Sequence, residues 1–143
     1  MGMKDNRSLL KFTNVSSPKA AVTDNTAFVS SIVDTKDFES NTFVISTGSL
    51  ADSDATFTVL IEDGDNASLT DNAAVADANL IGTEAKASFT FAADNSQRSI
   101  GYTGTKRYIR ATITPANNSG DIYISMLAVQ GHSRSETVAN TET

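Results

Sequence analysis

Residues 55–62 have the sequence ATFTVLIE, in which Phe57, Val59 and Ile61 occupy every second position. Because successive side chains of a β-strand point to opposite faces, this spacing places three large apolar groups on one face. Residues 107–114, RYIRATIT, repeat the alternation with smaller apolar residues. Both stretches therefore predict strands that bury one face in a core and turn the other towards solvent or a partner.

Five more runs rich in β-branched and aromatic residues are separated by clusters of Asp, Asn, Gly and Ser. They cover Ala27–Val33, Thr42–Thr47, Ala87–Ala92, Gln97–Tyr102 and Asp121–Gln130. The last run is apolar on both faces, which suits a central strand or one covered by a neighbouring subunit. Turn residues at Asp63–Asn66 and Asn117–Gly120 punctuate the runs, and the second turn is predicted to join a hairpin. Short strands separated by turns predict an all-β fold, an antiparallel β-sandwich.

Composition limits the classes of partner. The chain has 143 residues with 17 acidic and 11 basic side chains, for a net charge of -6. A negative net charge opposes binding to nucleic acid or to an anionic membrane. A chain of this length fits one domain. The sequence contains no cysteine, so stability must come from packing and strand pairing. With no long apolar run and no apolar segment at the start, we expect synthesis in the cytoplasm without a membrane anchor.

The two ends differ in composition from the middle. We expect an extended N-terminal arm over residues 1–26, a β-sandwich domain over residues 27–132 and a C-terminal tail over residues 133–143. Leu9, Leu10 and Phe12 are the apolar residues that we expect to anchor the N-terminal arm against a neighbour. Residues 68–84 are rich in Ala and Asn and predict a long connection containing one short strand.

No residue pattern assembles a catalytic site. His132 is the single histidine and no G-x-S-x-G motif accompanies it, so we expect a solvated or interface histidine and no enzyme activity. Zinc sites need clustered His or Cys, and the acidic residues make no twelve-residue calcium loop, so we expect no cofactor or metal. Structural calcium held by acidic turns stays open as an alternative. We expect the acidic turn residues to serve backbone geometry. These residues are Asp52, Asp54, Glu62, Asp63, Asp65 and Asp71.

A basic and aromatic cluster begins at the end of the run Gln97–Tyr102 and continues to residue 110. It consists of Tyr102, Lys106, Arg107, Tyr108 and Arg110. Three cations are few against the net negative charge, so we expect salt bridges or cation–π contacts that tie adjacent strands, or an ionic contact with an acidic subunit. The glycines of Gly101–Lys106 lack the spacing and the following helix of a phosphate-binding loop, and we expect a turn between strands there.

The segment Val33–Arg134 resembles small proteins encoded in the head-gene cluster of tailed bacteriophages. The matching motifs are D-T-x-x-F-E-S-x-T-F-V-I at Asp34–Ile45, T-F-x-x-x-I-E-D-G-D at Thr56–Asp65, D-x-x-L-I-G-T-E at Asp77–Glu84, I-G-Y-x-G-x-K-R-Y-I-R at Ile100–Arg110 and A-V-x-G-H-x-R at Ala128–Arg134. The order of the motifs also resembles, more loosely, discoidin-like and carbohydrate-binding sandwiches, although the chain has no Trp to stack a sugar ring. These resemblances imply a jelly-roll or discoidin-like sandwich.

The first resemblance implies a virion structural protein, with capsid decoration or cement protein as its most specific role. Its partners would be the major capsid protein and neighbouring copies of itself, as a homo-oligomer on the capsid surface. The interface would use Leu9, Leu10, Phe12, Tyr102, Lys106, Arg107, Tyr108 and Arg110. Two alternatives are a host-glycan or receptor-binding module on the virion, and a head–tail joining or tail component.

Overall fold

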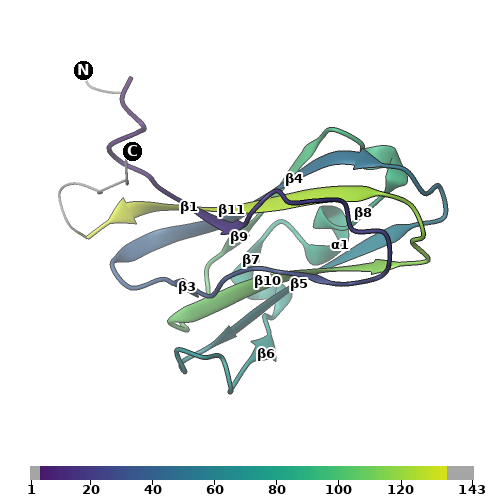
Figure 1. Cartoon of the computed structure of the whole chain (residues 1–143). Helices are drawn as coiled ribbons and strands as arrows, with labels where there is room; N and C mark the ends of the chain where they lie inside the picture. The colour runs from purple at the N-terminus through teal and green to yellow at the C-terminus, as the bar shows by residue number, and fades with distance from the viewer. Residues whose placement is uncertain (1–3, 135–143) are drawn as a thin grey trace.

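The computed structural model describes residues 4–134, which fold into two antiparallel sheets that face each other (Figure 1). We call them sheet A, with strand order β1–β11–β4–β9–β7, and sheet B, with strand order β2–β10–β5–β6, to which β3 adds on β10 and β8 adds on β5. The strands are β1 (Lys11–Ser16), β2 (Phe28–Val29), β3 (Val33–Asp34), β4 (Phe38–Leu50), β5 (Thr56–Gly64), β6 (Ala73–Ala74), β7 (Leu80–Ile81), β8 (Phe89–Thr90), β9 (Gln97–Tyr102), β10 (Tyr108–Ala116) and β11 (Ile122–Ser133). The short helices are η1 (Asp77–Asn79), α1 (Glu84–Ala87) and η2 (Phe91–Ala93). The prediction of an all-β antiparallel sandwich is confirmed.

The core lies between the two sheets and is built from the alternating residues of the long strands. Phe57, Val59 and Ile61 of β5 are all buried, as the spacing predicted. Sheet A contributes Phe43 and Ile45 from β4 to the same cluster. The opposing faces of β10 and β11 complete it with Ile109, Ala111, Ile113, Ile122, Ile124, Met126 and Ala128. Removing apolar surface from water is the main favourable term in folding, so this interface between the sheets holds the molecule together.

The strand β11 is an interior strand of sheet A, next to the edge strand β1. It pairs with β1 on one side and with β4 on the other. Pairing on both edges leaves the outward face of β11 uncovered, and Tyr123 on that face has an exposed fraction of 42%. The option of an interior strand is therefore realised within this chain, and cover of the outward face by a neighbouring subunit stays a prediction.

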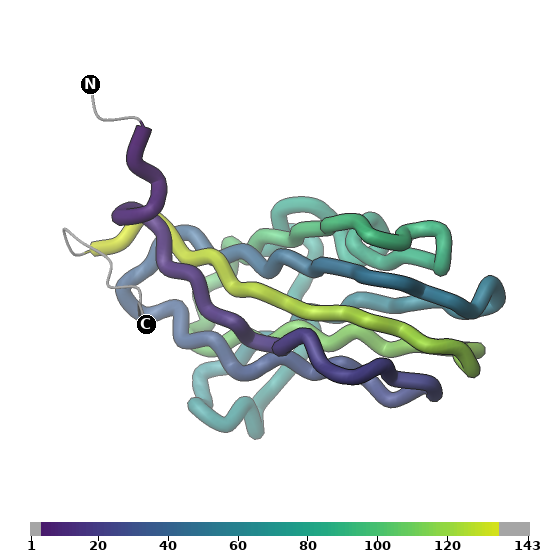
Figure 2. Tube along the Cα trace, turned by 45° about the horizontal axis from the view of Figure 1, so that its top comes forward, coloured from purple at the N-terminus to yellow at the C-terminus, as the bar shows by residue number. Residues whose placement is uncertain are grey.

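The segment expected as an arm over residues 1–26 contributes a strand to the sandwich. Residues 11–16 form β1, which runs beside β11 along its length (Figure 2). Val15 of β1 is buried in the core, and the backbone N–H of Ser31 donates to the Val15 carbonyl at 2.7 Å. The sandwich therefore begins well before residue 27. The difference arises because one buried valine and a ladder of backbone hydrogen bonds suffice to hold an edge strand that is otherwise polar.

Two of the turns that the sequence predicted between strands cross from one sheet to the other. The segment 117–120 joins β10 of sheet B to β11 of sheet A, so the predicted hairpin is wrong. The segment 103–107 likewise joins β9 of sheet A to β10 of sheet B. Residues such as Asn117, with φ of 58°, reverse the chain direction whichever sheet receives the next strand.

The middle of the chain contains more short elements than the sequence predicted. Residues 68–84 include β6, η1 and β7, whereas one short strand was expected. The run Ala87–Ala92 was predicted as a strand, but β8 covers two of its residues and lies between α1 and η2. The run Ala27–Val33 is divided between β2 and β3 because Ser30 bonds to Ala111 through its backbone N–H and its hydroxyl, at 2.9 and 3.0 Å. Within residues 4–134, no helix is long and apolar enough to cross a membrane.

Candidate functional site

The buried side chain of Tyr102 ties the two sheets together at one end of the sandwich. Its hydroxyl donates to Oδ2 of Asp63, on β5 of sheet B, at 2.8 Å. The same oxygen accepts the backbone N–H of Lys106 at 3.0 Å. Gly104 lies so close to the ring that a Cβ there would come within 2.5 Å of the Tyr102 hydroxyl. The absence of a side chain at Gly104 therefore lets the connection fold back over the ring of Tyr102.

Burial raises the pKa of Tyr102 above its usual range, and the hydrogen bond to Asp63 raises the pKa further. Both causes oppose the phenolate, because burial disfavours any charge and the nearby carboxylate repels a second negative charge. The phenol therefore stays protonated and keeps donating to Asp63. It is a structural group with an exposed fraction of 3%, not an open platform for a ligand.

Each cation of the basic cluster has an acidic partner on a neighbouring strand or in the turn after one. Arg107 forms two hydrogen bonds with the carboxylate of Asp34 at 3.0 and 2.9 Å, and its guanidinium lies 5.0 Å from the ring centre of Tyr108. The ammonium of Lys106 lies 2.9 Å from Asp65. Strand β10 supplies the third cation, Arg110, which meets Glu62 of β5 at 3.1 Å, directly opposite it in the ladder.

These ion pairs leave little free positive charge for nucleic acid. The hydrogen bond from Arg107 holds the pKa of Asp34 below its usual range, and that from Lys106 does the same for Asp65. A cation already matched by a carboxylate releases no counterions from a phosphate backbone. The arrangement agrees with the expectation of salt bridges that tie adjacent strands.

The predicted N-terminal anchor lies along sheet A, beside the end of β11. Leu10 covers Gly131 of β11, where an added Cβ would come within 2.8 Å of the leucine Cδ2. Leu9 and Phe12 are exposed, with exposed fractions of 53% and 45%. The eight residues predicted as one interface are thus divided. Tyr102, Lys106 and Arg107 gather at the sandwich end, Tyr108 and Arg110 lie on the outward face of sheet B, and Leu9, Leu10 and Phe12 border sheet A.

The outward face of sheet A carries a band of apolar side chains that the core does not cover. The register places Phe12 opposite Val129, and Leu127 opposite Val44, so these four residues share a face. Val44, Leu127 and Val129 are partly exposed. Ile81 of β7 extends the band over Gly101 with an exposed fraction of 65%. We call this set the sheet A band, and it consists of Phe12, Val44, Ile81, Leu127 and Val129.

Two of the acidic residues considered for calcium, Asp52 and Asp71, accept hydrogen bonds from backbone groups. Asp52 accepts the N–H groups of Asp54 and Ser119 at 2.9 and 2.8 Å, and these bonds lower its pKa. Asp71 accepts the N–H groups of Asp65 and Asn66 in the turn after β5. Over residues 4–134, no three His, Cys, Asp or Glu side chains gather as a metal site would require. His132 is exposed near the end of β11.

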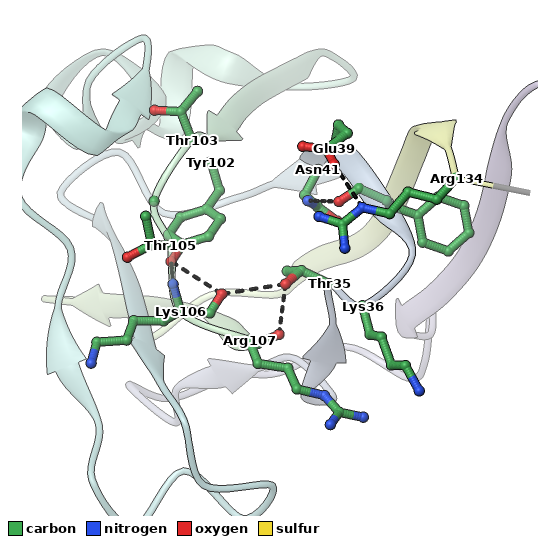
Figure 3. Close-up of a pocket in the computed structure, with 12 residues that line it drawn as sticks. Thr35, Lys36, Glu39, Asn41, Tyr102, Thr103, Thr105, Lys106, Arg107 and Arg134 are labelled. Carbon is green, nitrogen blue, oxygen red and sulfur yellow. Dashed lines mark hydrogen bonds and ion pairs between the residues drawn. The ribbon is translucent and has the colours of Figure 1, made fainter.

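A cavity of about 560 Å³ opens at the same end of the sandwich as Tyr102 (Figure 3). The turn after β3, the connection from β9 to β10 and the end of β11 line it. Its residues include Lys36, Glu39 and Arg134, which sequence reasoning did not select. Lys36 and Glu39 are close in the chain, but Arg134 is far from both, and the pairing of β4 with β11 brings it beside them. The lining residues also include Thr35, Phe38, Asn41, Thr103, Gly104 and Thr105.

The fold places the chain among two-sheet antiparallel β-sandwiches. No protein-family model matches the sequence, and a search of curated proteins found no match. Among solved structures, PBSX exported protein XepA superposes with a TM-score of 0.55 at 12% identity, over 92% of this chain and 40% of XepA. The chain therefore spans less than half of the length of that protein. At this identity the similarity shows a shared fold.

Two further solved structures give weaker superpositions. A family two carbohydrate esterase from Cellvibrio japonicus has a TM-score of 0.42 at 10% identity, over 94% of this chain and 36% of the esterase. SPBc2 prophage-derived protein YomS has a TM-score of 0.34 at 15% identity, over 82% of this chain and 94% of YomS.

Proposed function

We propose that this chain is a structural protein of a tailed-bacteriophage virion and that it acts as a capsid decoration or cement protein. In this role the protein binds the outer surface of the major capsid lattice and stabilises the lattice without catalysing a reaction. The proposal starts from the sequence motifs between Val33 and Arg134 that resemble head-cluster proteins. The sandwich fold, which is shared with XepA, is compatible with such a role.

The observation that carries the proposal is the sheet A band. An apolar surface of this kind on an otherwise acidic protein is typical of a protein–protein contact. The middle of the band, Val44, Leu127 and Val129, lies on strands β4 and β11, which are paired on both sides, so a partner would meet an ordered surface there that costs little entropy to fix. The neighbouring Leu9 is exposed and would extend the contact towards the N-terminal segment. Because such contacts repeat over the lattice, a moderate affinity at each site is sufficient for stable attachment to the capsid.

The test is binding to capsids assembled without this protein, measured by co-sedimentation and by occupancy in electron cryo-microscopy maps. Leu127→Lys and Val129→Lys place a charge in the band without reaching the core. We expect each to lower occupancy by at least tenfold. Thr58→Lys is the matched control, because Thr58 is exposed on β5 of the opposite sheet, and it should bind like the wild type.

Full occupancy by both band variants would contradict the proposal that the sheet A band contacts the capsid. Location in the map separates the proposal from the joining-protein alternative. A decoration protein follows the lattice of the major capsid subunits, whereas a joining protein forms a single ring at one vertex. Density in such a ring alone would contradict the proposed role.

A further inference from the structure

The outward face of sheet A carries no charged side chain over three consecutive rows of paired residues. Figure 2 shows three of the strands concerned, β1 in purple, β11 in yellow-green and β4 in blue, side by side. We call the three rows the neutral face, which contains the sheet A band and extends it with small and polar uncharged residues. The first row is Phe12, Val129, Thr42, Gly101 and Ile81, the second is Asn14, Leu127, Val44 and Ser99, and the third is Ser125, Ser46 and Gln97.

Two cations that are adjacent to these residues in sequence turn away from the neutral face. Arg98 lies between Gln97 and Ser99 on β9, and its guanidinium lies 5.6 Å from the ring centre of the buried Phe89. Lys11 precedes Phe12 on β1 and is opposite the buried Gln130, so it belongs to the other side of the strand. Alternation along the strands therefore keeps both charges off the face.

The outward face of sheet B is built differently. Arg110 of β10 is opposite Glu62 of β5, and the two form an ion pair at 3.1 Å. Tyr108 is opposite Asp34, whose carboxylate accepts from Arg107. The chain has 17 acidic and 11 basic side chains, and none of them occupies the three rows of the neutral face. The lack of charge is therefore a property of this face and not of the exposed strands in general.

A face without charge restricts the chemistry of its partner. Nucleic acid and anionic membranes are held by cations, which the neutral face does not offer. A partner patch rich in charge would have to lose the water around its charged groups against a surface that returns no ion pair, and this loss is costly. The cores of protein–protein interfaces are depleted in charged residues for the same reason. The neutral face therefore fits a protein surface that is itself uncharged.

We propose that the neutral face docks as a unit on an uncharged patch of the capsid surface. This proposal rests on the proposed capsid role and adds the chemistry of the partner surface. Attachment then comes from apolar burial and shape, and ion pairs contribute nothing to it. Salt screens ion pairs, because the Debye length falls from about 10 Å at 0.1 M to about 3 Å at 1 M, whereas apolar burial is not screened.

The first experiment measures the affinity of the full-length protein for capsids assembled without it, by co-sedimentation. The NaCl concentration is raised from about 0.1 M to about 1 M, the range over which screening changes most. We expect the affinity to stay constant or to rise, with any fall smaller than about threefold. A fall larger than about threefold would show that ion pairs hold the complex and would overturn the proposed partner chemistry.

The second experiment places charges of both signs on the neutral face at about 0.1 M NaCl, where a charged partner would distinguish them best. Leu127→Glu and Leu127→Lys test the middle of the face, and Gln97→Glu and Gln97→Lys test its β9 side. Each variant should bind at least about tenfold more weakly, and the two signs at one position should agree within about threefold. Gln97→Glu keeps the size of the side chain, so the wild type controls for shape.

Thr58→Glu and Thr58→Lys, on the exposed side of β5, are the matched controls and should bind like the wild type. Circular dichroism verifies that all six variants fold. Wild-type affinity for one sign, with loss for the other at the same position, would identify a charged partner patch. Wild-type affinity in both Gln97 variants would exclude the third row from the contact. Either result would overturn the proposal that the neutral face docks as a unit on an uncharged surface.

Sedimentation velocity tests whether a second copy occupies the face instead. Any self-association of the free protein should be the same in the wild type and in Leu127→Lys. A dimer that Leu127→Lys dissociates would assign the face to a second copy and would overturn the proposal. Capsids that bind no wild-type protein at any salt concentration would contradict the decoration role, and this proposal would fall with it. Salt-sensitive or sign-dependent binding would overturn the partner chemistry alone and would leave the decoration role in place.

Discussion

At the scale of single residues, Tyr102 links more parts of the molecule than any other side chain of the basic cluster. Its ring is packed against Gly104, and its hydroxyl joins β9 to β5 and to the backbone of Lys106. The motif around it predicted a hub that ties neighbouring strands. The structure shows that this hub acts within the chain, between sheets, through a buried hydroxyl.

Removing that hydroxyl should destabilise the fold. Tyr102→Phe leaves the carboxylate of Asp63 and the N–H of Lys106 without their partner, at a cost of about 1–3 kcal/mol in the free energy of unfolding. Tyr108→Phe is the control, because Tyr108 lies on the outward face of sheet B, and it should change stability by less than about 0.5 kcal/mol. Urea unfolding followed by circular dichroism measures both. Equal stabilities of the two variants would contradict the proposed bridge.

The raised pKa of Tyr102 predicts a dependence of stability on alkaline pH. The folded state holds the phenolic proton more tightly than the unfolded chain, whose tyrosine has a pKa near 10.0. The stabilisation is therefore complete below pH 10 and is lost as the pH rises above it. We expect the urea midpoint of the wild type to fall more steeply above about pH 10 than that of Tyr102→Phe. Parallel curves for the two proteins would show that Tyr102 does not cause the dependence.

At the scale of elements, the short helix α1 completes the edge of β5. Strands β6 and β8 pair with the two ends of β5 and leave its middle without a neighbouring strand. There the carboxylate of Glu84 accepts the N–H of Ile61 at 2.6 Å, and the hydroxyl of Ser88 accepts the N–H of Val59 at 3.0 Å. Side chains thus satisfy donors that would otherwise invite another strand.

Glu84→Ala should therefore weaken sheet B. The change leaves the N–H of Ile61 without an acceptor and should lower the free energy of unfolding by about 1–3 kcal/mol. Glu84→Gln keeps a side-chain oxygen at the same position and should cost less than about 1 kcal/mol. Hydrogen exchange of the Ile61 amide provides the local measurement. Unchanged protection of this amide in Glu84→Ala would refute the role of the carboxylate.

Sequence patterns predicted the long strands better than their connections. The bounds of β9 match the predicted run, and the buried faces of β5 and β10 follow their alternation, because period-two patterning reports burial directly. The assignment of strands to sheets could not be predicted in this way, since both sheets of a sandwich bury one face with the same period. Helix α1 was missed because four residues are too few for helical periodicity, although Thr83 caps it.

The candidate sites could likewise be predicted only where their residues are close together in the sequence. The positive charges of Lys106, Arg107 and Arg110 are adjacent in sequence and could be grouped before the fold was known. Their partners could not, because Asp34 and Asp65 come from other strands and turns. The cavity with Lys36 and Arg134 depends on long-range pairing of strands, and no local motif marks it.

At the scale of the whole molecule, the N-terminal segment is part of the sandwich. Deleting residues 1–25 removes β1 and exposes the edge of β11, so we expect the melting temperature to fall by at least about 5 °C. Deleting residues 1–8 keeps Leu9, Leu10 and β1, and should shift it by less than about 2 °C. Differential scanning calorimetry measures both. Equal melting temperatures would mean that β1 contributes no stability.

The position of β11 between β1 and β4 determines when the molecule can be completed during synthesis. Strand β1 has no partner strand in sheet A until residues 122–133 have left the ribosome, because it joins β4, β9 and β7 only through β11. Pairings between strands so distant in the chain require costly loop closure, which makes folding slow compared with helical proteins of similar size. Until then one edge of β4 is unpaired in sheet A, and a ribosome that stops before residue 122 releases a product without the strand that links β1 to β4.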